Sequence, residues 1–332
     1  MNAATQSTKG SSAPNARAIW RDRLGRLYSG SAVLFWPITD VVMRVFIAIA
    51  YLRSGWVKAW DWEMALLLAT EEYPVSWLSP FNAAVTGLTI ELVAPVLLAL
   101  GLFTRPAALA LAVLTIVSQV VYVPTTTNLM LIAMLLWYLI AGSAAISLDA
   151  LWVRKAGRRE GGLVGWAVDV GAWTRKVLGP VAMLVLRLWL GVSFLAYAGL
   201  IDPPIWLATW LVSTSFTGTP DWLAIAFALL LITGTLASPV SYALTFLIAA
   251  FMVAGVHPDI TFYPVLLFGV YEARGAGLLS VDRAVEQWLA KRSCGESKQM
   301  VDIDDPDQWF AMIGQIRTLG MQFTRRLRVK HR

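Results

Sequence analysis

The chain has 332 residues, of which 58% are hydrophobic and 14% are charged, and its mean hydropathy is +0.63. A soluble globular chain has about 45–50% apolar and about 25% charged residues, so this composition indicates a membrane protein, although the length would suit two soluble domains. One cysteine and two histidines exclude an internal disulfide and a Cys/His zinc site, and neither histidine lies in an apolar segment where it could ligate a haem.

Eight apolar segments approach the length of about 20 residues that a membrane-spanning helix needs. In chain order they cover residues 34–54, 81–103, 107–123, 128–148, 180–200, 222–236, 240–256 and 262–271. The sixth and the eighth are shorter than the others. The sequence therefore predicts an all-α, polytopic membrane protein with about eight transmembrane helices.

Basic segments flank these spans. An N-terminal arm at 1–33 and a C-terminal tail at 281–332 combine arginines with an amphipathic pattern, and a basic linker at 153–179 lies between the fourth and fifth spans. Such a pattern is typical of helices that lie in the membrane interface. We expect them to contact anionic lipid at the cytoplasmic face or to dock other protein subunits.

Positive charge is divided unevenly between the two sides of the predicted bundle. The arm, the linker, the tail and Arg105 fall on one side, whereas the loops on the other side are mostly acidic. Lys and Arg concentrate in cytoplasmic loops, so both termini are predicted to be cytoplasmic, in a bacterial inner membrane. The net charge of +6 follows this distribution and does not indicate a nucleic-acid partner.

The chain also contains an internal repeat. Gly101–Pro106 corresponds to Gly234–Pro239, and Ser147–Asp149 corresponds to Ser280–Asp282, both 133 residues later. Four spans per repeat is an even number, so both repeats enter the membrane from the same side. The sequence predicts two parallel four-helix bundles, at 34–152 and, in degenerate form, at 180–280.

These motifs resemble those of the DoxX/DoxD-like membrane protein family. The resemblance rests on a few short motifs: Arg44, Gly55, Lys58, Glu91, Gly101–Arg105 and Ile146–Asp149. It covers the first repeat well and the second weakly, where Ala224 and Ser238 stand in place of Glu91 and Arg105. Some relatives are named as the membrane subunit of thiosulfate:quinone oxidoreductase, so the resemblance implies a quinone-facing subunit of a respiratory or thiosulfate-type complex.

Ionisable residues inside predicted spans are candidates for function because they are costly to insert. Asp40 and Arg44 are four residues apart and share a helical face. Arg44 and Glu91 each lie about ten residues into a span, which is about 15 Å, so we expect them to meet near mid-depth. Arg187 either reaches Glu91 across the repeats or extends towards the interface.

The site hypothesis follows from this set. Glu91 is predicted as the catalytic proton acceptor in quinol oxidation, and quinone-binding residues are predicted to be Arg44, Asp40, Arg187, Arg105 and Lys58. The alternative is a buried ion pair that only fixes helix register. No metal site and no intrinsic cofactor are predicted beyond a possible quinone, so any electron-transfer group would belong to a partner.

The first outer loop, between residues 55 and 80, is rich in tryptophan and is expected to form short interfacial or re-entrant helices. It would anchor the protein, cover a hydrophobic ligand, or dock a partner. At the level of the whole chain, three functions stay open: a quinone-interacting subunit, a transporter with a pathway between the repeats, and a structural or assembly subunit.

Overall fold

The computed structural model describes residues 16–72, 74–121, 124–156, 163–211, 221–235 and 277–284, with the single positions 241, 245, 270 and 314. Within these ranges every regular element is a helix and no strand occurs, which confirms the all-α class. Nearly all of the predicted seventh and eighth spans and most of the C-terminal tail lie outside the described residues.

The first helix, α1, runs from Ala16 to Trp60 with Pro37 inside it. The predicted arm and the first predicted span are therefore one continuous helix from residue 16 onwards. Two short elements follow, α2 (Trp62–Leu67) and the π-helical η1 (Leu68–Glu72). Asp61 starts α2 because its carboxylate accepts a hydrogen bond from the Met64 amide at 2.9 Å.

Three apolar helices come next: α3 (Pro80–Leu100), α4 (Thr104–Val121) and α5 (Thr126–Ala141). Gly101 ends α3 in the left-handed region, with φ of 64°, where a side chain would be strained. Gly142 ends α5, also with a positive φ, of 73°, so the fourth predicted span runs several residues too far. The short helix α6 (Leu148–Ala156) then leads into the linker.

The second half of the described chain contains α7 (Leu163–Tyr197), α8 (Ile205–Ala208) and α9 (Asp221–Thr233). The long α7 joins much of the predicted linker to the fifth span and has Pro180 inside it, 143 residues after Pro37. Among the described residues, three helical segments are long and apolar enough to cross a membrane: Pro80–Leu100, Thr104–Val121 and Val168–Ala196. Helices α5 and α9 are apolar but shorter.

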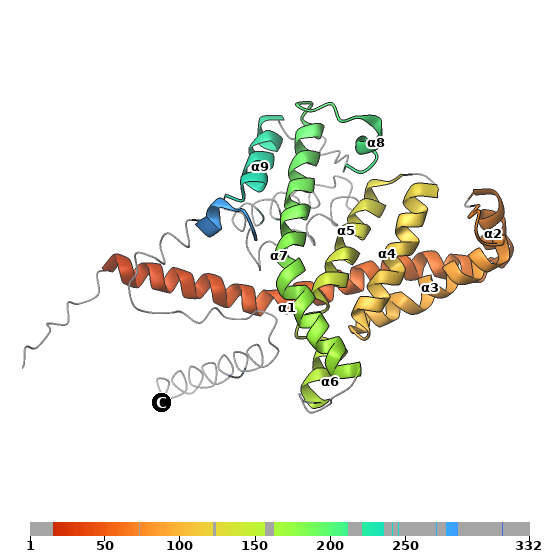
Figure 1. The fold of residues 1–332 in the computed structure, drawn as a ribbon, viewed down its shortest axis with the longest axis horizontal. Coiled ribbons are helices and arrows are strands. Elements are labelled where there is room, and N and C mark those ends of the chain that lie inside the picture. The colour runs from red at the N-terminus through yellow and green to blue at the C-terminus, as the bar shows by residue number, and fades with distance from the viewer. Residues whose placement is uncertain are drawn as a thin grey trace, which may run out of the picture.

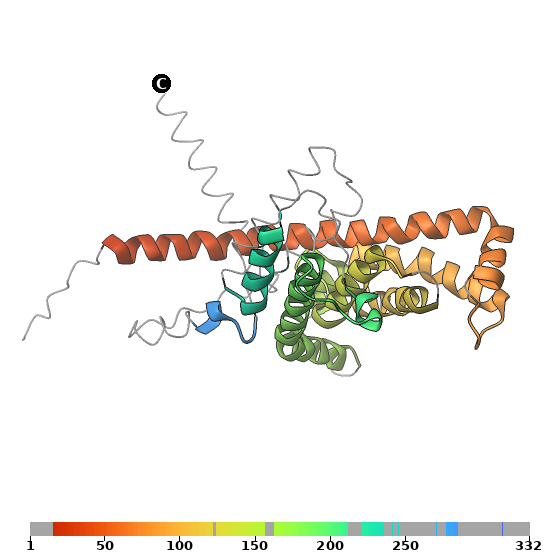
Figure 2. The same ribbon diagram turned by 90° about the horizontal axis from the view of Figure 1, so that it is seen from above.

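Figure 1 shows how these helices are arranged. Helix α1 runs along the long axis of the molecule, and α3 folds back beside its second half. Helix α5 packs against both α4 and α7, and α9 packs against α7. In both views α7 lies across the direction of α1 (Figures 1 and 2), so the first helices of the two predicted repeats are not parallel. The eight-span arrangement of two parallel bundles stays a prediction.

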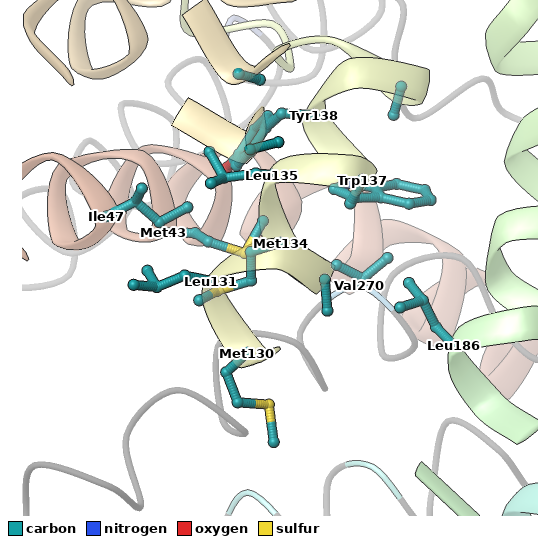
Figure 3. Packing of buried hydrophobic residues seen from close by; sticks show 14 of the residues in the cluster. Met43, Ile47, Met130, Leu131, Met134, Leu135, Trp137, Tyr138, Leu186 and Val270 are labelled. Atoms are coloured by element: carbon teal, nitrogen blue, oxygen red, sulfur yellow. The ribbon is translucent and has the colours of Figure 1, made fainter. Parts of the chain in front are cut away.

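The core is centred on α5. Its residues from Leu129 to Leu135 are all buried, and so are Trp137 and Tyr138. Figure 3 shows Met43 and Ile47 of α1 beside Met134 of α5, with Leu186 of α7 on the side of Trp137. Such a helix, apolar around its whole circumference, is shielded by its neighbours. In a membrane this burial stabilises the fold through close packing, because lipid is itself apolar.

Candidate functional site

Asp40 and Arg44 form a fully buried ion pair on α1, with Arg44 Nη2 3.0 Å from Asp40 Oδ2. The same carboxylate oxygen accepts hydrogen bonds from Arg44 Nε at 3.0 Å and from the Ala144 amide at 3.1 Å. Arg44 also donates to the backbone carbonyls of Ala99, at 3.0 Å, and Ile146. The guanidinium therefore ties α1 to the end of α3 and to the loop after α5.

The expectation that Arg44 meets Glu91 is wrong. Helix α3 runs antiparallel to the second half of α1, so that Ala99 and Gly101 lie opposite Arg44. Glu91 lies two turns earlier on α3, opposite Gly55. The prediction counted each residue from the start of its predicted span and so placed Arg44 at mid-depth, whereas Arg44 lies level with the end of α3.

Glu91 is instead paired with Lys58, whose Nζ lies 2.6 Å from Glu91 Oε1. The glutamate side chain is 8% exposed and the lysine side chain is 29% exposed. A Cβ added at Gly55 would lie 3.0 Å from the Cβ of Glu91, so this glycine permits the close approach of α1 and α3. The second carboxylate oxygen, Oε2, is buried and has no hydrogen-bond partner among the residues that the structure describes.

A cavity of about 950 Å³ lies beside this pair, between α1, η1, α3, α4 and the start of α5. Its volume is at the upper end of the range of about 300–1,000 Å³ for small-molecule pockets. Apolar side chains make most of the wall: Phe46, Ile49, Leu68, Val75, Leu88, Leu114, Val117, Val121 and Leu131. Polar and charged side chains also line it: Tyr51, Arg53, Ser54, Lys58, Glu91, Thr115, Ser118, Thr127 and Asn128.

The first outer loop forms short helices, as the sequence predicts, and contributes to the cavity. Ala65 of α2 and Ala69 of η1 are buried and line it. Neither residue stood out in the sequence, because small alanines spaced four apart carry no chemical signal.

A second polar group on the cavity wall was not predicted from the sequence. The hydroxyls of Tyr51 and Thr115 are hydrogen-bonded to each other, and both side chains are buried. Thr115 Oγ1 also donates to the Leu111 carbonyl at 2.6 Å. Since a threonine hydroxyl has one proton, the Tyr51 hydroxyl is the donor to Thr115. The one available signal was the spacing of Tyr51 from Lys58, seven residues along the same helical face.

Arg105 lies away from the cavity and connects α4 to α7. It donates to the Thr174 hydroxyl at 2.8 Å and to the carbonyls of Gly171, at 2.6 Å, and Ile140, at 3.0 Å. Arg175 of α7 donates to the next carbonyl of α5, that of Ala141, at 2.7 Å. The two arginines thus cap the C-terminal end of α5, where the helix dipole favours positive charge.

Arg187 does not reach Glu91, so that alternative for this residue is wrong. It is fully buried and donates to the carbonyls of Leu278 and Leu279 at 3.2 Å each. The left-handed Gly234 lies against its guanidinium, as Gly101 lies against that of Arg44. Arg187 therefore matches Arg44 in its contacts with backbone carbonyls and with a left-handed glycine, but it has Met183 where Arg44 has Asp40.

Further backbone contacts correspond between the two halves. The Asp149 amide donates to Gly101 at 2.8 Å, and the Asp282 amide donates to Gly234 at 3.2 Å. A serine lies two residues before each aspartate, and its hydroxyl donates to a nearby backbone carbonyl. Ser147 donates to Ala144 at 2.9 Å, and Ser280 donates to Gly277 at 3.0 Å. Each contact in the first half has its counterpart 133 residues later, which is the offset that the motifs predict.

Of the six residues predicted for the site, the structure places Lys58 and Glu91 together on the cavity wall. Asp40 and Arg44 form a separate cluster, and Arg105 and Arg187 each bind backbone carbonyls elsewhere. None of these four is among the described residues that line the cavity.

The apolar spanning helices and the all-helical fold define a polytopic helical membrane protein. In a comparison with known families, the DoxX family model matches residues 39–123 of this chain. The match confirms the resemblance over these residues, which include Lys58, Glu91 and most of the cavity wall. The chain matches no curated protein and no solved structure.

Proposed function

We propose that this DoxX-like protein is a quinone-interacting inner-membrane subunit of an oxidoreductase complex, and that the cavity holds the quinone-type head group next to Lys58 and Glu91. One observation carries the proposal: a carboxylate oxygen of Glu91 is buried at the wall of a large, mostly apolar cavity without a hydrogen-bond partner among the described residues. Buried polar atoms in native proteins are nearly always hydrogen-bonded, so this oxygen points to a ligand.

The chemistry of the pair suits such a head group. Lys58 can donate a hydrogen bond to a carbonyl oxygen, and Glu91 can accept a proton from a hydroxyl. The apolar wall suits an aromatic ring with an alkyl chain. The described residues contain no group of three His, Cys, Asp or Glu side chains that could ligate a metal. In this proposal a partner subunit supplies the electron-transfer group.

The proposal includes two tandem repeats of unequal role. The corresponding arginine, glycine, serine and aspartate contacts of the two halves support a duplication. The second repeat carries Ala224 at the position of Glu91, so the ligand site belongs to the first repeat. The basic arm, linker and tail support a cytoplasmic location of both termini, next to anionic lipid and partner subunits.

Filling the cavity tests the proposal. Gly87 lines the cavity and has no atom within 4 Å of where a Cβ would lie, so Gly87→Leu starts its side chain in open space. Thr86→Leu is the matched control, because Thr86 is the adjacent, exposed residue and does not line the cavity. The full-length protein is extracted from native membranes, and its quinone content and partner subunits are measured.

We expect quinone to co-purify with the wild type and with Thr86→Leu, and to be lost from Gly87→Leu. Equal quinone content in both variants would place the quinone elsewhere and contradict the proposal. A stoichiometric partner without quinone in any preparation would favour a structural or assembly subunit. Solute flux in partner-free liposomes, again without quinone, would favour a transporter.

A further inference from the structure

Two arginines lie together at the end of the bundle that carries α6 and the start of α7, opposite the end that carries α8 (Figure 1). We propose that Arg105 and Arg175 bind the phosphate group of an anionic phospholipid at the cytoplasmic face of the membrane. Neither residue lines the cavity beside Glu91, so this inference does not depend on the quinone proposal.

The two guanidinium groups lie close together over Gly142, the residue that ends α5. A Cβ added at this glycine would lie 3.3 Å from Arg105 Nε and 3.5 Å from Arg175 Nη2. Both side chains are held in place by the last carbonyls of α5, those of Ile140 and Ala141. These contacts keep two like charges near each other, and an anion bound beside them would offset their repulsion.

The acidic neighbour of this pair does not balance both charges. Asp149 accepts hydrogen bonds from the Phe103 amide at 2.9 Å, from the Thr104 amide at 3.0 Å and from the Thr104 hydroxyl at 2.8 Å. Its carboxylate is therefore bound to the start of α4, and Arg105 forms no ion pair with any residue that the structure describes. One carboxylate beside two guanidinium groups leaves a positive charge.

Arg105 also has an N–H group that a ligand can use. Its Nη1 donates to Thr174, and its Nη2 donates to the carbonyls of Ile140 and Gly171. Its Nε has no acceptor in the described part of the chain and is not one of the buried atoms left without a partner, so it is accessible from outside. A phosphate oxygen would accept a charge-assisted hydrogen bond from this atom, and Arg175 would add its charge.

The two arginines lie at the level where lipid head groups are expected. Two of the helical segments that are long and apolar enough to cross a membrane begin at this end, at Thr104 and Val168. Arg105 and Arg175 lie within about the first two turns of these segments. Tryptophan is enriched at the boundary between head groups and acyl chains. Three exposed tryptophans lie on α6 and the start of α7: Trp152, Trp166 and Trp173.

The surface next to the site favours a lipid over a soluble anion. Beyond Arg175, towards the middle of its span, α7 exposes a series of apolar side chains: Val177, Leu178, Val181 and Val185. An acyl chain can pack along this surface while the phosphate group binds the arginines. A free phosphate ion would gain only the second of these contacts.

Two phospholipids with the same acyl chains test the inference. Dioleoyl phosphatidylglycerol is anionic, whereas dioleoyl phosphatidylcholine has the same phosphodiester and no net charge. Each is titrated into the full-length protein in detergent, and bound lipid is measured by native mass spectrometry. We expect phosphatidylglycerol to bind at least about tenfold more tightly, and excess inorganic phosphate should not displace it. Equal affinities, or displacement by inorganic phosphate, overturn the inference.

Substitutions then locate the bound lipid. Arg105→Gln and Arg175→Gln should each weaken binding of phosphatidylglycerol at least about fivefold, because each removes a charged donor. Lys176→Gln is the matched control, since it removes the same charge from an exposed position next to Arg175, and it should change the affinity less than about twofold. Equal losses in all three variants would reflect a general attraction of basic residues to anionic lipid and contradict a defined site.

A second measurement separates lipid binding from stability, because Arg105 also connects α4 to α7. Thermal unfolding of each protein is measured with and without phosphatidylglycerol, so that the effect of the lipid is compared within one variant. The lipid should raise the unfolding temperature of the wild type and of Lys176→Gln, and should have little effect on the two arginine variants. The same increase in all four proteins contradicts the inference.

Discussion

The buried charges of this protein differ in the partners they have. Arg44 and Arg187 donate to backbone carbonyls at the ends of helices, so their positive charge holds chain segments together. Lys58 and Glu91 bind each other beside a cavity, and the second carboxylate oxygen of Glu91 is buried without a hydrogen-bond partner among the described residues. Both kinds of charged residue are buried, so burial does not separate a structural role from a ligand-binding role. The group that each side chain binds does separate them.

The first prediction concerns the Asp40–Arg44 pair. Arg44→Met should lower the free energy of unfolding by about 3–5 kcal/mol, since it leaves the buried Asp40 carboxylate without its counter-charge. The measurement is unfolding of the full-length protein in detergent micelles. Lys176→Met, an exposed position on α7, should change stability little.

A double variant makes this prediction sharper. Asp40→Leu combined with Arg44→Met should be less destabilised than the sum of the two single variants, because it removes both charges together. Additive losses would show that the two charges do not depend on each other.

The individual residues of the site could be found from sequence, but their pairing could not. Short motifs identified Lys58 and Glu91, and the spacing of four residues predicted the shared face of Asp40 and Arg44. Which of these charged side chains form a pair depends on the register of α3 along α1. That register is set by close packing at Gly55 and by the turn at Gly101, and neither effect is visible in the hydropathy of the spans.

At the scale of elements, the ends of helices were predictable where the chain carries a local stop signal. Helix α3 begins at Pro80, directly after its N-cap Ser79, and ends at the left-handed Gly101, close to the predicted span. The boundaries of α1 and α7 were not found, because a change from polar to apolar residues does not break a helix. Pro37 and Pro180 lie inside these long helices.

The second prediction concerns the attachment of α7 to the first half of the bundle. Arg105→Gln should remove hydrogen bonds to α7 and to the end of α5, so α7 should separate more often from α4 and α5. Amide hydrogen exchange across residues 166–176 should then be faster. Lys176→Gln removes the same charge from an exposed position of α7 and should leave exchange unchanged; equal rates in both variants would contradict the assignment.

At the scale of the whole molecule, charge predicts the orientation in the membrane. Glu63 of α2 belongs to the first outer loop, and Arg283 follows the second repeat on the side of the basic tail. Both side chains are exposed. The two positions should therefore face opposite sides of the membrane.

The third prediction tests that orientation. In a Cys294→Ser background, Glu63→Cys should react with a membrane-impermeant maleimide in intact spheroplasts, and Arg283→Cys should react only after the membrane is opened. The background variant without an added cysteine is the control for unspecific labelling. Labelling of both positions, or of Arg283→Cys first, would contradict the orientation.

The long sequence separations of the arginine contacts have a consequence for biosynthesis. The carbonyl of Ile146 is made 102 residues after Arg44, and that of Leu279 is made 92 residues after Arg187. Each arginine therefore emerges from the ribosome well before those acceptors exist. Helix α1 carries its own counter-charge four residues earlier, at Asp40, whereas α7 has Met183 at the corresponding position. The first helix can thus enter the membrane beside its own counter-charge, which the second helix does not carry at the corresponding position.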